Sequence, residues 1–279
     1  MWALHHVNIA TPHVRRTVDF FESVFGMKEQ PFPFEIDNRG VFIDTEDYVA
    51  FFEDGPRQIH VCQPMPELPR DNGFCLNPLL HGHVAITVLD ITEVRRRLDG
   101  LGVYVADAGR WAYKGYYQIY CYDPALNVVE INSPIDGPPP IPAAGGHGWR
   151  ITSVSVPALD LAASSAFYRE AFGMEQRRAP AGGPDRAVVE LFSDGVGEIH
   201  LCRPEPWVVA RRQLRLDPII DGHFGVEVDD LAAVRDRLAD RAAVWIDVPA
   251  WEYADVAQIY CYDPGLNVVA VRQRPAPPR

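Results

Sequence analysis

Short apolar runs bounded by turn residues alternate, over the first 135 residues, with two stretches whose apolar residues lie three or four positions apart. The runs predict strands and the wider spacing predicts helices. The first predicted helix ends at Gly26, and the second begins with a capping box formed by Asp90 and Glu93. The predicted order is β-α-β-β-β, twice over. The predicted strands are His5–Ala10, Gly40–Asp44, Tyr48–Glu53, Arg57–Cys62, His81–Val88, Val103–Ala106, Tyr117–Tyr122 and Asn127–Ile131, and the predicted helices are Val14–Phe25 and Ile91–Leu101.

The second half of the chain repeats this pattern. Residues Gln118–Glu130 read QIYCYDPALNVVE and residues Gln258–Ala270 read QIYCYDPGLNVVA, so the two segments differ only at the turn and at the last position. Helices are predicted again, at Ala163–Gly173 and Leu231–Leu238, and the Pro/Gly-rich stretch Asp136–His147 has the composition of a linker. The predicted organisation is an α+β protein with domains at 1–135 and 148–274, a linker at 136–147 and a fraying tail at 275–279.

The charge and the cysteine content of the chain limit the kinds of molecule that it is expected to bind and the compartment in which it is expected. The formal net charge is −12, and no cluster of basic residues is interleaved with aromatic ones, so we expect no binding to nucleic acid or to anionic membranes. Without a leader pattern or a stretch of ~20 apolar residues, the chain is expected to be soluble and cytoplasmic. Four of the five cysteines are equivalent between the repeats, and none forms a Cys-x-x-Cys pair, so we expect small buried core residues.

The polar positions that differ between the halves are the candidates for chemistry. Two histidines and a glutamate on predicted strands of the first half form the ligand set of non-haem Fe(II) oxygenases, and these donors also suit Mn, Ni, Co or Zn. A strand histidine can equally be a core residue with satisfied hydrogen bonds, whereas a strand carboxylate flanked by apolar residues is costly unless it is paired or binds a metal. The first-half residues His6, His83 and Glu130 correspond to Ser153, His223 and Ala270 of the second half.

Three segments carry a resemblance to a known superfamily: HHVNIATP with the following helix, HGHVAITV with the following helix, and QIYCYDPALNVVEI. With these segments, nearly all of both halves resembles the vicinal oxygen chelate proteins. These include glyoxalase I, methylmalonyl-CoA epimerase, fosfomycin- and bleomycin-resistance proteins and type I extradiol dioxygenases. The resemblance implies tandem β-α-β-β-β modules that form two curved-sheet domains, with His6, His83 and Glu130 as metal ligands. It also implies a second domain without a complete metal site.

The resemblance leaves the roles of His60 and Tyr120 open. In the extradiol branch a histidine at the place of His60 is an acid–base, and in the glyoxalase and epimerase branches this strand supplies a fourth metal ligand. Tyr120 lies where extradiol enzymes carry a tyrosine that hydrogen-bonds the substrate. The second half keeps His200 and Tyr260 at these two places, so packing roles are the alternative for both residues.

Two more residues are candidates for substrate binding. Lys114 and Tyr116 occur only in the first half, where they could bind an anionic substrate or an enolate, although a solvated loop lysine is the alternative. The chain also departs from the extradiol pattern. No histidine stands near Trp111–Tyr113, Leu126 replaces a turn glycine, and the candidate metal site is in the N-terminal domain rather than in the C-terminal one.

The sequence therefore predicts a metal-dependent enzyme with a single active site, acting on a small substrate with vicinal oxygens, for which an aromatic molecule is one candidate. An extradiol-like Fe(II) dioxygenase comes first, with His60 as acid–base and Tyr120 as a substrate contact. The alternatives are a redox-neutral isomerase, epimerase or lyase of the glyoxalase type, and a small-molecule binding protein of the bleomycin-resistance type. The exposed edges of the predicted sheets either pair with each other within the chain or pair between two copies of it, which would make the protein a homodimer.

Overall fold

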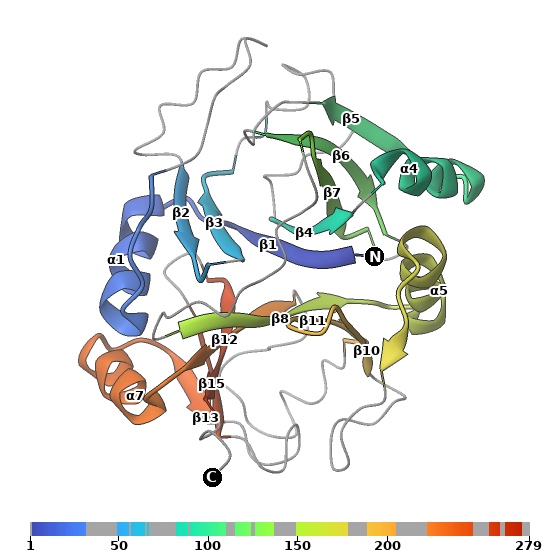
Figure 1. Ribbon diagram of the computed structural model, residues 1–279. Helices are drawn as coiled ribbons and strands as arrows, with labels where there is room; N and C mark the ends of the chain where they lie inside the picture. The colour runs from blue at the N-terminus through green and yellow to red at the C-terminus, as the bar shows by residue number, and fades with distance from the viewer. Residues whose placement is uncertain are drawn as a thin grey trace.

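The computed structural model describes residues 2–31, 49–55, 57–64, 66, 82–88, 90–109, 115–123, 126–136, 149–177, 189–204, 222–247, 257–262 and 266–274. The predicted strand Gly40–Asp44, the candidate Lys114, and the predicted linker and tail, apart from Asp136, lie outside these ranges. The described strands form two mixed sheets, one from each half of the chain, and four helices accompany them (Figure 1). The α+β fold predicted from the sequence is therefore confirmed.

The first sheet contains both modules of the first half, in the strand order β2-β3-β1-β4-β7-β6-β5. Strands β1 and β4, which open the two modules, pair antiparallel at its centre, and β7 lies parallel to β4 on the other side. The first strands of the two modules and the last strand of the half are thus neighbours. Its elements are β1 (Trp2–Ala10), α1 (Val14–Phe25), β2 (Val49–Glu53), β3 (Gln58–Cys62), β4 (His83–Val88), α4 (Ile91–Gly100), β5 (Val105–Gly109), β6 (Tyr116–Tyr122) and β7 (Val128–Pro134).

The second sheet repeats this arrangement in the order β13-β14-β15-β12-β8-β11-β10-β9. Strands β8 and β12 pair antiparallel, and β15 lies parallel to β12, as β7 lies to β4 in the first sheet. Its elements are β8 (Trp149–Pro157), α5 (Leu161–Phe172), β9 (Gln176–Arg177), β10 (Val189–Ser193), β11 (Glu198–Cys202), β12 (His223–Val228), α7 (Leu231–Asp240), β13 (Trp245–Asp247), β14 (Gln258–Tyr262) and β15 (Val268–Gln273).

One apolar core joins the two halves. Helix α1 packs beside α7 and α4 beside α5, while β1 and β8 run along the middle of the molecule (Figure 1). The rings of Phe21 in α1 and Phe224 in β12 lie 6.2 Å apart between centroids, and Val7 and Val154 belong to the same buried cluster. Because successive strand residues face opposite ways, a β1 residue that does not face this core points to the other side of the first sheet.

The helix ends follow local chemistry. Gly26 closes α1 with a left-handed φ of 70°, as its sequence position predicts. Helix α5 begins at Leu161, two residues before the predicted start, because the Asp160 side chain caps it by accepting a hydrogen bond from the Ala163 N–H. None of the helices in the described ranges is long and apolar enough to cross a membrane.

The repeated Asp-Pro turn uses a left-handed residue in both halves. Leu126 has φ 66° and Leu266 has φ 65°, and both side chains are exposed. Glycine adopts this conformation more easily than leucine, which explains why glycine is the usual residue there. Asn127 stabilises the first turn by donating backbone and side-chain hydrogen bonds to Asp123, at 2.9 and 2.8 Å.

The four cysteines in the described part of the chain are free and buried, as expected for core residues. Burial raises the pKa of the Cys62 thiol to about 12, although a hydrogen bond from Asn8, at 3.0 Å, opposes this. At about pH 8 only roughly 10⁻⁴ of such a thiol is ionised, and the thiolate is the reactive form. We expect Cys62 to resist iodoacetamide in the native protein and to react after unfolding in urea. Peptide mapping by mass spectrometry measures this, and rapid labelling of native Cys62 would contradict it.

Candidate metal centre

A β-bulge in β1 brings two consecutive histidines to one face of the first sheet. The pairing of β1 with β4 is regular from Trp2 to Leu4 and again from His6 to Asn8, with a register shift between Leu4 and His6. A bulge inserts one residue and locally cancels the alternation of side chains. His5 and His6 therefore meet, with their Nδ1 atoms 2.8 Å apart, instead of facing opposite ways.

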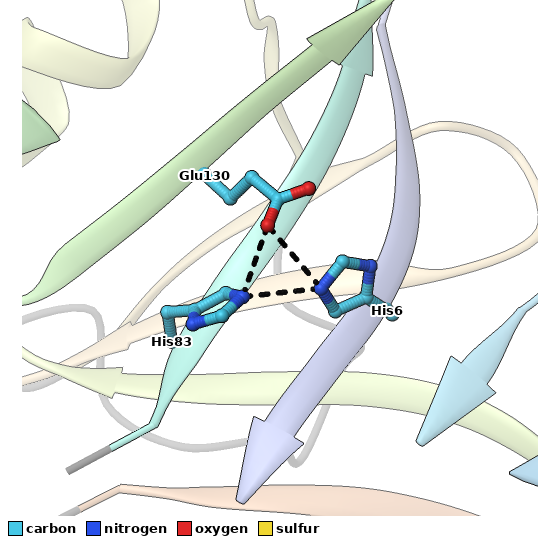
Figure 2. A group of neighbouring side chains, drawn as sticks. All are labelled: His6, His83 and Glu130. Atoms are coloured by element: carbon cyan, nitrogen blue, oxygen red, sulfur yellow. Dashed lines mark hydrogen bonds and ion pairs between the residues drawn. The ribbon is translucent and has the colours of Figure 1, made fainter. Parts of the chain in front are cut away.

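His6, His83 and Glu130 converge from three neighbouring strands, β1, β4 and β7 (Figure 2). The Nε2 atoms of the two histidines lie 3.1 Å apart, and Glu130 Oε2 lies 3.6 Å from His6 Nε2 and 3.2 Å from His83 Nε2. Ala85 is the direct cross-strand neighbour of both His6 and Glu130. Its small side chain leaves the space between them to the three donor groups.

Hydrogen bonds hold both oxygens of the Glu130 carboxylate. Gln118 and Asn132 each donate an amide N–H to Oε1 at 2.9 Å, and the Tyr120 hydroxyl donates to Oε2 at 2.8 Å. Burial alone would raise the pKa of Glu130, but the hydrogen bonds and charge of His83 and the two amide donors outweigh it and hold that pKa at about 2. The carboxylate is therefore ionised at neutral pH, with Oε2 facing the two imidazoles.

The imidazoles of His5 and His6 are held neutral. Burial, reinforced by the neighbouring rings of His5 and His83, lowers the pKa of His6 well below its usual value. Burial likewise lowers the pKa of His5 to about 4. A metal-binding histidine must present an unprotonated nitrogen, and a metal-binding glutamate must be ionised. The protonation states of His6 and Glu130 thus match what a divalent cation requires of its ligands.

His60 lies beside this group but does not join it. Its ring stacks on His6, with centroids 3.8 Å apart and planes inclined by 22°, and its Nε2 lies 3.0 Å from Gln58 Oε1. Within the described ranges, the cluster of convergent donor atoms consists of His6, His83 and Glu130 alone. Burial lowers the pKa of His60 as well, so its imidazole is neutral.

The other two predicted site residues in the described ranges, Tyr120 and Tyr116, both lie near the donor group. Tyr120 contacts Glu130, as described above, and Tyr116 is half-buried with its ring 5.2 Å from that of His5. Tyr116 is therefore near the donor group, while its neighbour Tyr117 bonds Asp107 at 2.8 Å.

Sequence reasoning missed His5, Gln118 and Asn132. Asn132 could have been found by the comparison of halves, since its counterpart is Arg272. Gln118 could not, because Gln258 preserves it in the second half.

The second sheet keeps the framework of the site without its donors. Ser153 stands where His6 stands, in a bulge of β8 against β12, and Ala270 replaces Glu130. Arg272, at the place of Asn132, donates to Gln258 Oε1 at 2.6 Å. Among the described residues of this half, no group of three metal-binding side chains converges. A candidate metal site is thus found in the first half and not in the described part of the second.

The hydrogen bond from Tyr120 to Glu130 predicts a difference between the two equivalent tyrosines. Tyr120→Phe removes a donor to the ligand oxygen, and such changes around a metal ligand typically weaken metal binding about 10–100-fold. Tyr260→Phe should leave affinity unchanged, because alanine replaces the glutamate there. Titration of the metal-free variants with Co(II) measures both affinities, and equal losses in the two variants would contradict a specific role for Tyr120.

Paired modules in each half, with two imidazoles and one carboxylate on adjacent strands of the first half, define a duplicated scaffold with a candidate metal site. The sequence matches the Glyoxalase/Bleomycin resistance protein/Dioxygenase superfamily over residues 3–131 and 150–271. The chain belongs to this superfamily, and the predicted membership is confirmed. A search of curated proteins gave no match.

Several solved structures share the fold. A catechol 2,3-dioxygenase is 14% identical with a TM-score of 0.62, and the match covers 99% of this chain and 90% of that one. The Mn(II)-bound glyoxalase from Novosphingobium aromaticivorans is 13% identical with a TM-score of 0.61, covering 97% and 81%. A triple mutant of 4-hydroxymandelate synthase from Streptomyces coelicolor is 15% identical with a TM-score of 0.60, covering 99% and 94%. Both halves are needed for each of these matches.

Proposed function

We propose that the protein is a metal-dependent enzyme that binds two neighbouring oxygens of a small substrate, and that its reaction is an extradiol-type dioxygenation with Fe(II). The observation that supports this is the convergence of His6, His83 and the ionised Glu130, while His60 stays outside the group. Two imidazoles and one carboxylate with remaining open positions suit non-haem Fe(II) oxygenases. The donor set fits such a metal.

The residues around the donors have complementary roles in this proposal. Fe(II), when bound, would supply Lewis acidity and a binding position for O2. His60, whose ring stacks on that of His6 beside the donor group, is the proposed base that takes the proton from a substrate hydroxyl. Tyr120 and Gln118 hold Glu130 so that its Oε2 faces the imidazoles. Tyr116 and Lys114 remain predicted substrate contacts, and the substrate class is a catechol-like aromatic molecule, as the name of one similar protein suggests.

A redox-neutral isomerase, epimerase or lyase is the second candidate. It is favoured by the structural likeness to a glyoxalase whose described form binds Mn(II), because the same three donors accept Mn, Ni, Co or Zn. In that case His60 would transfer a proton to or from a substrate carbon, or would serve as a fourth ligand. The two candidates differ in whether O2 is consumed.

The test uses protein purified without oxygen, loaded with Fe(II) and mixed with a panel of catechols. Uptake of about one O2 per catechol, with the absorbance of a ring-cleaved product, supports the dioxygenase. Turnover under strict anaerobiosis, with solvent deuterium appearing at a substrate carbon, would replace it by the redox-neutral reaction. Tight ligand binding that survives chelators, with the ligand recovered unchanged, would favour a binding protein instead.

The pair His60→Asn and His200→Asn is the matched control for the acid–base role. Both histidines occupy the same place in their halves, and both bond a side chain two residues earlier, at 3.0 Å to Gln58 and 2.8 Å to Glu198. Only the first variant should lower kcat, by about 10²–10⁴-fold if general acid–base catalysis is lost. Equal rates in both variants would exclude His60 from the chemistry.

A further inference from the structure

The two halves exchange a pair of equivalent hydrogen bonds. Asp194, in the turn between β10 and β11, accepts the backbone N–H of Leu4 on its Oδ2 at 2.8 Å. Asp54, in the turn between β2 and β3, accepts the backbone N–H of Ile151 on its Oδ2 at 2.7 Å. Each aspartate also stabilises its own turn through Oδ1. Asp194 Oδ1 accepts a hydrogen bond from the backbone N–H of Gly197 at 2.6 Å, and Asp54 Oδ1 accepts one from the backbone N–H of Arg57 at 2.9 Å. Each half therefore fixes the first strand of the other.

The residue that Asp194 holds is the one before the bulge of β1. Register with β4 is regular up to Leu4, shifts, and resumes at His6. The Leu4 side chain is buried in the shared core, with 2% of its surface exposed, and its backbone N–H is bound to the carboxylate of the other half. The chain entering the bulge is thus fixed by both a core contact and a charge-assisted hydrogen bond.

A buried arginine partly offsets the negative charge of the two aspartates. Arg57 is 1% exposed, bonds the carbonyl oxygen of Ile151, and interacts electrostatically with both Asp54 and Asp194. Its counterpart in the second half is Gly197, where an added Cβ would approach the Arg57 guanidinium to 3.1 Å. The small residue on one side makes room for the large one on the other, so both carboxylates lie near one shared positive charge.

The bulge decides which nitrogen of His6 faces the other donors. His5 and His6 touch through their Nδ1 atoms, so one of these nitrogens donates and the other accepts. A histidine that binds a metal through Nε2 carries its proton on Nδ1 and donates it to a second group, which fixes the ring. His5 is placed to be that group, and Nε2 of His6 then faces His83 and Glu130 (Figure 2).

We propose that the half without a metal site positions the metal ligand of the other half: Asp194 holds Leu4, the bulge turns His5 against Nδ1 of His6, and Nε2 of His6 is directed to the metal position. This inference rests on the metal site of the proposed function. Asp194 and His5 are positioning residues, because neither presents a donor atom to the convergent group.

The second half offers the control. Asp54 does for Ile151 what Asp194 does for Leu4, and the bulge that follows leads to Ser153 instead of a histidine. Loss of either aspartate removes one equivalent contact between the halves. Only the loss of Asp194 disturbs a strand that carries a ligand, although Asp54 lies in the same half as the ligands.

The experiment compares Asp194→Ala and Asp54→Ala in the full chain. Each metal-free protein is titrated with Co(II), followed by visible absorption, and its unfolding midpoint in urea is measured separately. We expect Co(II) affinity to fall about tenfold in Asp194→Ala, the lower end of the range for groups that orient a ligand, and to stay within about twofold of wild type in Asp54→Ala. The two unfolding midpoints should fall by similar amounts.

Unchanged affinity in Asp194→Ala, or an equal loss in both variants, would overturn the inference and leave the proposed function standing. Failure of the wild type to bind Co(II) would overturn both. If Asp194→Ala does not fold, the pair His5→Leu and His5→Asn decides. Leucine removes the hydrogen bond and should cost about 10–100-fold in affinity, whereas the asparagine amide can replace the His5 Nδ1 and should restore most of it. Equal affinities of these two variants would overturn the inference.

Discussion

Glu130→Ala should purify without metal, while the wild-type protein carries about one equivalent. The substitution removes one of three protein ligands, so affinity should fall by at least ~100-fold, more than the loss typical of a group that only orients a ligand. It also leaves Gln118, Asn132 and Tyr120 without the acceptor that each now contacts. Elemental analysis of protein purified without oxygen measures the metal content of both proteins.

Variants at the two equivalent histidines provide the control for this loss. His83→Ala removes a second donor of the convergent group and should also release the metal. His223→Ala changes the same position of the second sheet and should retain about one equivalent, since that sheet lacks the other two donors. One equivalent of metal in Glu130→Ala would contradict the proposed site. A wild-type protein without metal would favour the alternative function, a small-molecule binding protein.

Gly82→Ala should have the second largest effect, on both stability and metal binding. Gly82 precedes the ligand His83 with a φ of +83°, and an added Cβ would overlap the carbonyl oxygen of Asn8 in the neighbouring strand β1. A left-handed non-glycine residue alone costs about 1–3 kcal/mol, and the overlap with backbone adds to this. Relief of the overlap must move the start of β4 away from β1, and so move His83 away from His6.

Gly222→Ala separates the two parts of that effect. Gly222 precedes His223 with a φ of +78°, and its added Cβ would overlap the carbonyl oxygen of Ser155 in β8. Both alanine variants should therefore lower the urea midpoint by similar amounts. Only Gly82→Ala should weaken Co(II) binding in titrations below the unfolding transition. Retained affinity in that variant would show that the β4 start does not position His83.

Much of the fold could be predicted because local patterns specify it. The spacing of apolar residues predicted α1 with its observed ends, and the repeat of Gln118–Glu130 in the second half predicted a duplicated scaffold. The comparison of the halves also singled out His6 and Glu130, whose counterparts are Ser153 and Ala270, but not His83, because His223 preserves it. The predicted boundary between domains stays a prediction.

What could not be predicted depends on contacts between distant strands. Strict alternation would place His5 and His6 on opposite faces, and the bulge that brings them together is visible only in the pairing of β1 with β4. Likewise, Asp194 reads as an ordinary turn residue in the sequence, because its bond to Leu4 spans the interface between halves. No local pattern contains that information.

Because the shared core lies between the two sheets, the residues that stabilise the fold and the residues of the candidate metal site lie on opposite faces of the first sheet. The donors of the first sheet lie on the face turned away from that core, and the equivalent face of the second sheet has Ser153 and Ala270 in place of two of them, while both sheets contribute to the core around Phe224 and Val154. Changes on the outward faces therefore leave the packing of the shared core in place, although the outward faces have buried side chains of their own. In such a duplicated chain the two outward faces can differ in their polar residues while both halves share one core.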